Sequence, residues 1–202
     1  AYEQDFLSNL TTERPVPYRE VVASAKDRSC LRRLINRGVV RISGFTPSDA
    51  AHILGLQSQW TKQAAMYACE LLGRATGRVS GTDAEAQLHA LAQEVHATVV
   101  EKSTRLLIDQ LAGQKFDPQD NLVTSVATGK GAINDLQIKL HSRIPLVAVG
   151  GPAGIFYPAV GERLGQQVLV PEHSAVANAV GAAVGHVKSS CCIEITMNES
   201  GG

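Results

Sequence analysis

The chain has 202 residues, of which 44% are hydrophobic and 19% charged, and its 19 Lys and Arg balance its 19 Asp and Glu. This composition can build the core of one large domain or two small ones, and it carries no cationic footprint for nucleic acid or an anionic membrane surface. No apolar stretch approaches the roughly 20 residues of a membrane span, and the N-terminus lacks the regions of a signal peptide. We therefore expect neither a nucleic-acid nor a membrane partner.

The cysteines and histidines give no metal-ligand pattern. The cysteines are Cys30, Cys69, Cys191 and Cys192, without a CxxC pair, and the six histidines include no HExxH motif. We expect reduced thiols, a cytoplasmic protein and no metal site. The chain begins with Ala and ends with NESGG after a strand-like run, which indicates a piece of a longer protein.

The first predicted region, 1–43, is a lead-in with one helix and one strand. Residues 1–28 are mixed and contain Pro15 and Pro17. The segment 29–38 is typical of a helix that Gly38 closes, and 39–45 alternates apolar and polar residues like a strand.

The second predicted region, 44–114, is a helical subdomain. Thr46 can cap a helix with Pro47 at its first position and Asp49 at capping-box spacing, and this helix should end near Gly55. A second helix should end at Gly73, and a third should begin at a capping box of Thr82 and Glu85 and run to Leu111 before Gly113. The expected apolar side of the second helix is Trp60, Ala64, Met66, Tyr67 and Leu71.

The third predicted region, 115–202, is an α/β subdomain. After a turn at 115–121, short apolar runs alternate with glycines and short helices. Strands are predicted at 122–127, 145–150, 167–170 and 191–196, and helices at 158–164 and 174–185. The fold class is therefore predicted as α/β with a helical insertion.

Several glycines lie between a predicted strand and a predicted helix in the segment LVAVGGPAGIFYPAVGERLG, 146–165. Glycine lets the backbone approach a ligand closely, and the N-terminus of the following helix favours negative charge. The segment matches neither GxGxxG nor a P-loop, so a plain tight turn is an equal alternative. Lys130 stands between glycines in 127–134 without Walker spacing, which favours a surface turn over a phosphate site.

Three separate motifs carry a family resemblance. The segments Gly44–Gly55, with GFTPSDAAHILG, Pro145–Leu164, and Val170–Ala183, with VPEHSAVANAVGAA, occur in this order. Over residues 28–187 the chain resembles the hydantoinase A/5-oxoprolinase (N-methylhydantoinase) family of the actin-like, ribonuclease H-like ATPase superfamily. The resemblance implies part of the ATPase core of an ATP-dependent hydrolase that opens cyclic amides such as hydantoins or 5-oxoproline. Acetone carboxylase has a related subunit.

Compared with the family it resembles, this chain lacks the loops that bind phosphate. Actin-like ATPases hold Mg-nucleotide phosphates with DxGxT-type loops, but none of the eight aspartates here is followed by x-Gly. We therefore expect ATP and Mg in a full-length parent, no evident catalytic residue here, and little hydrolysis from this chain alone. The nucleotide-binding residues implied are Gly150, Gly151, Pro152 and Ala153, on the adenosine side.

A second candidate segment contains Thr46, Ser48, Asp49 and His52. The resemblance implies a substrate-side loop, whereas the local pattern favours a capped helix start. The leading hypothesis is a hydrolase fragment that works with a partner subunit of the hydantoinase B type. The alternatives are a non-catalytic subunit-binding module that uses the surface of 46–112, and part of an acetone carboxylase-type subunit.

Overall fold

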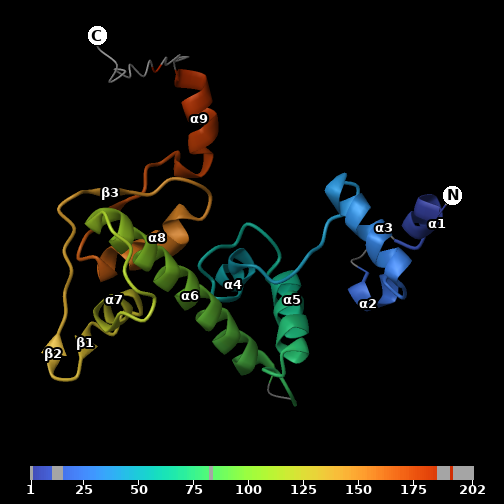
Figure 1. Cartoon of the computed structure of the whole chain (residues 1–202), viewed down its shortest axis with the longest axis horizontal. Helices are drawn as coiled ribbons and strands as arrows, with labels where there is room; N and C mark the ends of the chain where they lie inside the picture. The colour runs from blue at the N-terminus through green and yellow to red at the C-terminus, as the bar shows by residue number, and fades with distance from the viewer. Residues whose placement is uncertain (1, 11–15, 82–83, 186–191, 193–202) are drawn as a thin grey trace, which may run out of the picture. The chain divides into compact units, whose positions relative to one another are not determined.

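The structure is a computed structural model that describes every residue except 1, 11–15, 82–83, 186–191 and 193–202 (Figure 1). The described residues are mostly helical, and the strands among them are short. The chain divides into two compact units, Ala1–Val95 and His96–Gly202.

The first unit begins with three helices, α1 (Tyr2–Ser8), α2 (Tyr18–Val21) and α3 (Ala25–Asn36). Their shared core contains Phe6, Cys30, Leu31 and Leu34. Helix α3 begins at a capping box of Ser24 and Asp27, and Gly38 follows its end with a φ of 70°. The predicted helix at 29–38 is therefore confirmed, with an earlier start.

The strand predicted at 39–45 is wrong. The backbone N–H groups of Val39 and Val40 both donate to the carbonyl oxygen of Leu34, so the chain here completes the end of α3. No described strand of this unit is available to pair with 39–45. Alternating polarity alone cannot make a strand without a neighbour, because ladder hydrogen bonds need a second strand.

Helices α4 (Pro47–Ile53) and α5 (Lys62–Ala75) pack with the first part of α6. The capping box at Thr46 is present, and Gly55 closes α4 with a φ of 71°, so both predictions are confirmed. The buried residues of this core are Ala50, Ile53, Ala65, Cys69, Val79, Leu88, Leu91 and Ala92. Burial raises the pKa of the Cys69 thiol, and the nearby charge of Asp49 adds to this effect.

The predicted apolar side of α5 is largely wrong. The helix buries Ala65, Cys69 and Gly73, which recur every fourth residue, whereas Trp60, Tyr67 and Leu71 are 68%, 60% and 72% exposed. The small residues face the core because they allow α5 to lie close to its neighbours. The predicted end of this helix at Gly73 is also wrong, because α5 continues to Ala75 and buries Gly73 within it. A Cβ at Gly73 would meet the Val79 side chain at 2.2 Å.

Helix α6 (Ala84–Ala112) confirms the long predicted helix, and Gly113 follows it with a φ of 67°. The predicted cap at Thr82 lies outside the described residues. The boundary between the two units falls within this helix. Its C-terminal part contributes to the second unit's core, which contains Val100, Ile108, Val123, Val126, Phe156, Val160 and Leu164.

Residues 122–127 form a helix, α7 (Asn121–Ala127), so the predicted strand is wrong. The Asp120 carboxylate accepts a hydrogen bond from the Val123 N–H at 2.9 Å and caps the helix. The helix then buries Val123, Val126 and Ala127, which lie on one side at helical spacing. A short apolar run with a capping residue in front of it suits a helix as well as a strand.

The rest of the second unit contains two strand pairs. Strands β1 (Ala132–Ile133) and β2 (Leu136–Gln137) form an antiparallel hairpin. Strands β3 (Leu146–Val147) and β4 (Val168–Leu169) are parallel, with Leu146 opposite Val168, and α8 (Ala153–Arg163) connects them. The predicted strands at 145–150 and 167–170 are thus present but shorter.

Helix α8 begins at Ala153 and contains Pro158, whereas the predicted helix began at that proline. The predicted helix at 174–185 is present as the 3-10 turn η1 (Ser174–Val176) followed by α9 (Ala177–Val184). The strand predicted at 191–196 lies outside the described residues, apart from Cys192. The second unit therefore mixes helices with a parallel strand pair, as an α/β character requires. No helix in the described part of the chain is long and apolar enough to cross a membrane.

Candidate functional site

The candidate nucleotide segment is the turn between β3 and α8. Gly150 has a φ of 111°, in a region that side chains avoid, so glycine is required there. Its N–H donates to the carbonyl oxygen of Ser174 at 2.7 Å, and its own carbonyl accepts from the Ala153 N–H at 3.1 Å. The turn is thereby fixed to the segment that leads into η1.

At the start of α8, backbone groups rather than polar side chains are available to contact a ligand. Pro152 is its N-cap and provides no side-chain hydrogen bond, and Ala153 is buried. A Cβ at Gly151 or at Gly154 would meet no atom within 4 Å. The surface in front of the turn is therefore open to a close approach by a ligand, and the helix N-terminus behind it favours negative charge.

The second candidate segment is the start of α4. The Asp49 carboxylate accepts hydrogen bonds from the Thr46 N–H at 2.8 Å and from the Thr46 hydroxyl at 2.6 Å. Thr46 Oγ1 in turn accepts from the Asp49 N–H at 3.3 Å. Both side chains thus stabilise the helix start, as the local pattern predicted. Their additional role on a substrate-side loop stays a prediction.

His52 is buried, with 3% of its surface exposed, and it joins α4 to the loop that follows. Its Nε2 accepts a hydrogen bond from the Trp60 N–H at 3.0 Å, so the ring proton is on Nδ1, which lies 2.8 Å from the Ser48 carbonyl oxygen. The ring stacks on Trp60 with centroids 5.4 Å apart. The Gln57 amide also donates to the Ser48 carbonyl, at 2.8 Å. These contacts occupy both nitrogens of the ring.

The two candidate segments lie in different units, since 46–52 falls in Ala1–Val95 and 150–153 in His96–Gly202. The geometry of the first is that of a capped helix with a buried histidine, and the geometry of the second leaves an accessible backbone turn. The second is the better candidate for ligand binding.

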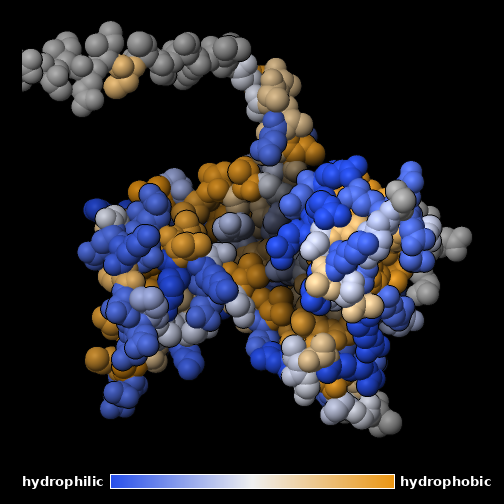
Figure 2. Space-filling view, turned by 45° about the vertical axis from the view of Figure 1, so that its right-hand side comes forward, coloured by the Kyte–Doolittle hydropathy of each residue, from blue (hydrophilic) through white to orange (hydrophobic). Residues whose placement is uncertain are grey.

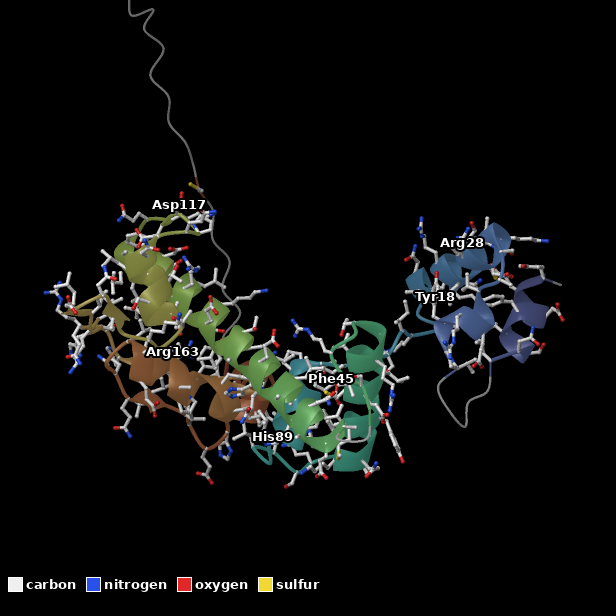
Figure 3. The ribbon with its side chains drawn as sticks, turned by 90° about the horizontal axis from the view of Figure 1, so that it is seen from below. Tyr18, Arg28, Phe45, His89, Asp117 and Arg163 are labelled. Atoms are coloured by element: carbon white, nitrogen blue, oxygen red, sulfur yellow. The ribbon has the colours of Figure 1, made fainter. Side chains whose placement is uncertain are left out.

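Two further histidines, His89 and His96, have different surroundings. His89 is exposed on α6 (Figure 3). His96 stacks on Phe156 with ring centroids 5.1 Å apart. In the described residues no group of three or more His, Cys, Asp or Glu side chains is arranged to hold a metal ion.

Sequence reasoning missed Arg163, at the end of α8 (Figure 3). Its guanidinium donates to the carbonyl oxygen of Ala127, the last residue of α7. Burial lowers the pKa of Arg163, although the charge of Glu101 acts in the opposite direction. An arginine in the last turn of a helix is an ordinary surface pattern, so no signal in the sequence pointed to this contact.

No family model, curated protein or solved structure matches the chain. Its function is therefore inferred from the motifs and from the local geometry of the β3–α8 turn.

Proposed function

We propose that the chain supplies the adenosine side of the nucleotide site in an ATP-dependent hydrolase of cyclic amides, of the hydantoin or 5-oxoproline type. The observation that carries the proposal is the β3–α8 turn: Gly150 at positive φ, Gly151 open to solvent, and a following helix without a side-chain cap. Such a turn can accept a nucleotide against its backbone. The family motifs at Pro145–Leu164 and Val170–Ala183 support the same assignment.

In the parent enzyme the γ-phosphoryl group of ATP would transfer to the amide oxygen of the substrate, and ADP would leave. Water would then attack the activated carbon, the ring C–N bond would open and phosphate would be released. Residues Gly150–Ala153 would hold the nucleoside, while Mg and the phosphates would be held by loops outside this chain. A partner subunit of the hydantoinase B type would complete the enzyme.

The first test is nucleotide binding by the chain itself, measured by the fluorescence of a mant-labelled ATP. We expect saturable binding that unlabelled ATP displaces, and we expect Gly151→Val to weaken it at least tenfold. A valine Cβ at this position meets no protein atom within 4 Å, so the fold should persist while the ligand is excluded.

The matched control is Gly44→Val. Gly44 is also exposed, has no positive φ, and would have no atom within 4 Å of an added Cβ. This variant should bind nucleotide like the original chain. Equal binding by all three proteins, or no displaceable binding at all, would contradict the proposal.

A second candidate function is a non-catalytic module that binds another subunit. The exposed side chains of Trp60, Tyr67 and Leu71 favour it, because they lie at helical spacing along α5 and its N-terminal approach. Figure 2 shows areas of exposed hydrophobic side chains, in orange, between hydrophilic ones, in blue. Exposed aromatic side chains grouped in this way are typical of interfaces.

This alternative predicts a complex without nucleotide. A hydantoinase B-type subunit mixed with the chain should give a heteromeric species in light scattering, and Tyr67→Ser with Leu71→Ser should dissociate it. The control is Leu106→Ser, at a side chain 69% exposed on α6. A complex that forms only in the presence of ATP, and that persists when Tyr67 and Leu71 are replaced by serine, would favour the first function instead.

A further inference from the structure

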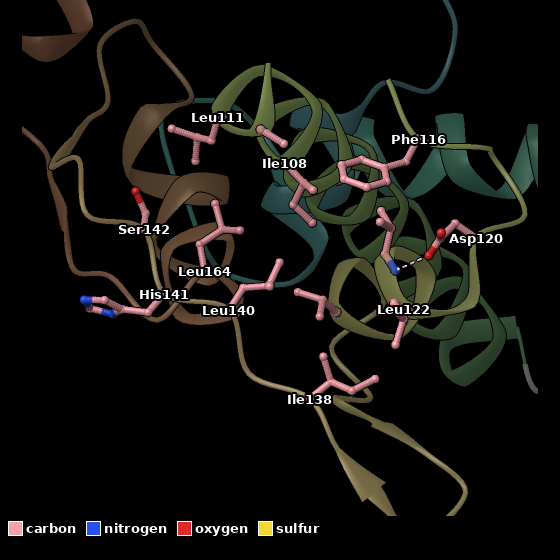
Figure 4. A pocket seen from close by; sticks show the side chains of 13 residues that line it. Ile108, Leu111, Phe116, Asp120, Leu122, Ile138, Leu140, His141, Ser142 and Leu164 are labelled. Carbon is pink, nitrogen blue, oxygen red and sulfur yellow. Dashed lines mark hydrogen bonds between the residues drawn. The ribbon is translucent and has the colours of Figure 1, made fainter. Parts of the chain in front are cut away.

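The second unit contains an apolar cavity of about 390 Å³ (Figure 4). Helix α6 contributes Ile108 and Leu111, and the loop before α7 contributes Phe116. Ile138, Leu140 and Leu164 complete most of the apolar wall. This volume is within the range of about 300–1,000 Å³ that small-molecule sites occupy.

The polar side chains in the lining of this cavity already have partners. Asp120 caps α7 through the Val123 N–H, and the Ser142 hydroxyl donates to the Ile144 carbonyl at 2.9 Å. Nδ1 of His141 lies 2.8 Å from the Gly165 carbonyl oxygen. The cavity therefore presents mainly hydrocarbon to an occupant.

A larger cavity, of about 740 Å³, adjoins the first, since Val126, Ile138, Leu140 and His141 line both. Its lining contains three cationic side chains, Lys130, Lys139 and Arg163, against one carboxylate, Glu162. The Arg163 guanidinium is committed to the Ala127 carbonyl. In the described part of the chain, the ammonium groups of Lys130 and Lys139 have no ion-pair partner.

We propose that the two adjoining cavities form one binding site for an amphipathic carboxylate with an unbranched aliphatic chain. The chain occupies the apolar cavity, and the carboxylate lies in the second cavity, beside Lys130 and Lys139. A neutral apolar ligand would make no contact with the charges of these exposed lysines, and a small polar anion would leave the apolar wall empty. The site is independent of the proposed nucleotide site, because Gly150–Ala153 line neither cavity.

The affinity of the site should depend separately on the length of the aliphatic chain and on the charge of the carboxylate. Each methylene buried in the apolar cavity should strengthen binding about fourfold. The carboxylate should contribute about a further tenfold, and this part should weaken as the salt concentration rises.

The test is isothermal titration calorimetry on the full chain with sodium decanoate, octanoate and butyrate and with decylammonium chloride. We expect decanoate to bind more than tenfold tighter than octanoate, and butyrate to give no detectable heat. Decylammonium should bind at least tenfold more weakly than decanoate, because its charge has the wrong sign. These comparisons use the unaltered chain, so they do not depend on the folding of any variant.

Two variants then assign the parts of the site. Lys130→Gln with Lys139→Gln should weaken decanoate binding at least tenfold, and Leu140→Asn should reduce the gain from octanoate to decanoate. The control is Lys62→Gln with Lys102→Gln, at exposed lysines outside both cavities, and circular dichroism checks the folding of each variant. Equal binding of decanoate and decylammonium, no binding of decanoate, or equal effects of the two lysine pairs would overturn the proposal.

Discussion

At the scale of single residues, Gly73 sets the distance between α5 and the segment that follows it. Adding a Cβ there would bring it within 2.2 Å of Val79 Cγ2 and 2.9 Å of Val79 Cβ. Alanine is the better helix former by about 1 kcal/mol, but overpacking a core costs about 1–3 kcal/mol. We expect Gly73→Ala to destabilise the protein by up to about 2 kcal/mol, measured as the free energy of unfolding in urea.

The control for this change is Gly181→Ala, in α9. No atom lies within 4 Å of a Cβ at Gly181, so the better helix propensity should act alone and leave stability unchanged or slightly higher. If both substitutions gave the same result, close packing at Gly73 would not be the cause.

The surroundings of His52 show which hydrogen bonds can be predicted from the sequence and which cannot. The spacing of Thr46 and Asp49 predicted their mutual hydrogen bonds, because both partners are local. The bond from the Trp60 N–H to His52 Nε2 depends on how the chain returns after Gly55, which no local pattern encodes. The sequence therefore predicted the cap and missed the buried histidine beside it.

At the scale of elements, the caps determine where helices begin. Thr46→Ala removes the hydroxyl that accepts from the Asp49 N–H and donates to its carboxylate. We expect a loss of about 1 kcal/mol in the free energy of unfolding, which chemical denaturation measures.

Thr61→Ala provides the comparison, since Thr61 is the N-cap of α5 and makes no side-chain capping bond. It should cost only a few tenths of a kcal/mol. A loss at Thr61 as large as that at Thr46 would show that threonine's intrinsic preference, rather than the hydrogen bonds, explains the effect.

The predictions of helices and strands were wrong where packing against another segment determines the secondary structure or the buried side. Residues 122–127 form α7 because Asp120 caps them and their apolar side packs against α6 and α8. Residues 39–45 lack a strand partner among the described residues, and Val39 and Val40 instead donate hydrogen bonds to the end of α3. In α5 the small residues at 65, 69 and 73 are buried, while larger apolar side chains are exposed.

At the scale of the whole molecule, each unit buries its own residues, and the described residues of the first unit contain two separate clusters. The buried residues around Ile53 and Cys69 belong to Ala1–Val95, and those around Val100 and Phe156 belong to His96–Gly202. The sequence predicted a change of character between a helical middle and an α/β end. It did not predict that one helix, α6, would contribute to the cluster around Cys69 and to the cluster around Phe156.

By itself the sequence determined the local features of this protein: the capped helix start at Thr46, the turn that precedes residue 122, the closing of helices at Gly38, Gly55 and Gly113, and the two strands on either side of α8. These depend on hydrogen bonds and backbone conformations within a few residues. Only the tertiary structure decided which face of α5 is buried, that 122–127 is a helix, and that Lys130 and Lys139 adjoin an apolar cavity. Each of these depends on packing between segments distant in the chain, where side-chain burial outweighs local preference.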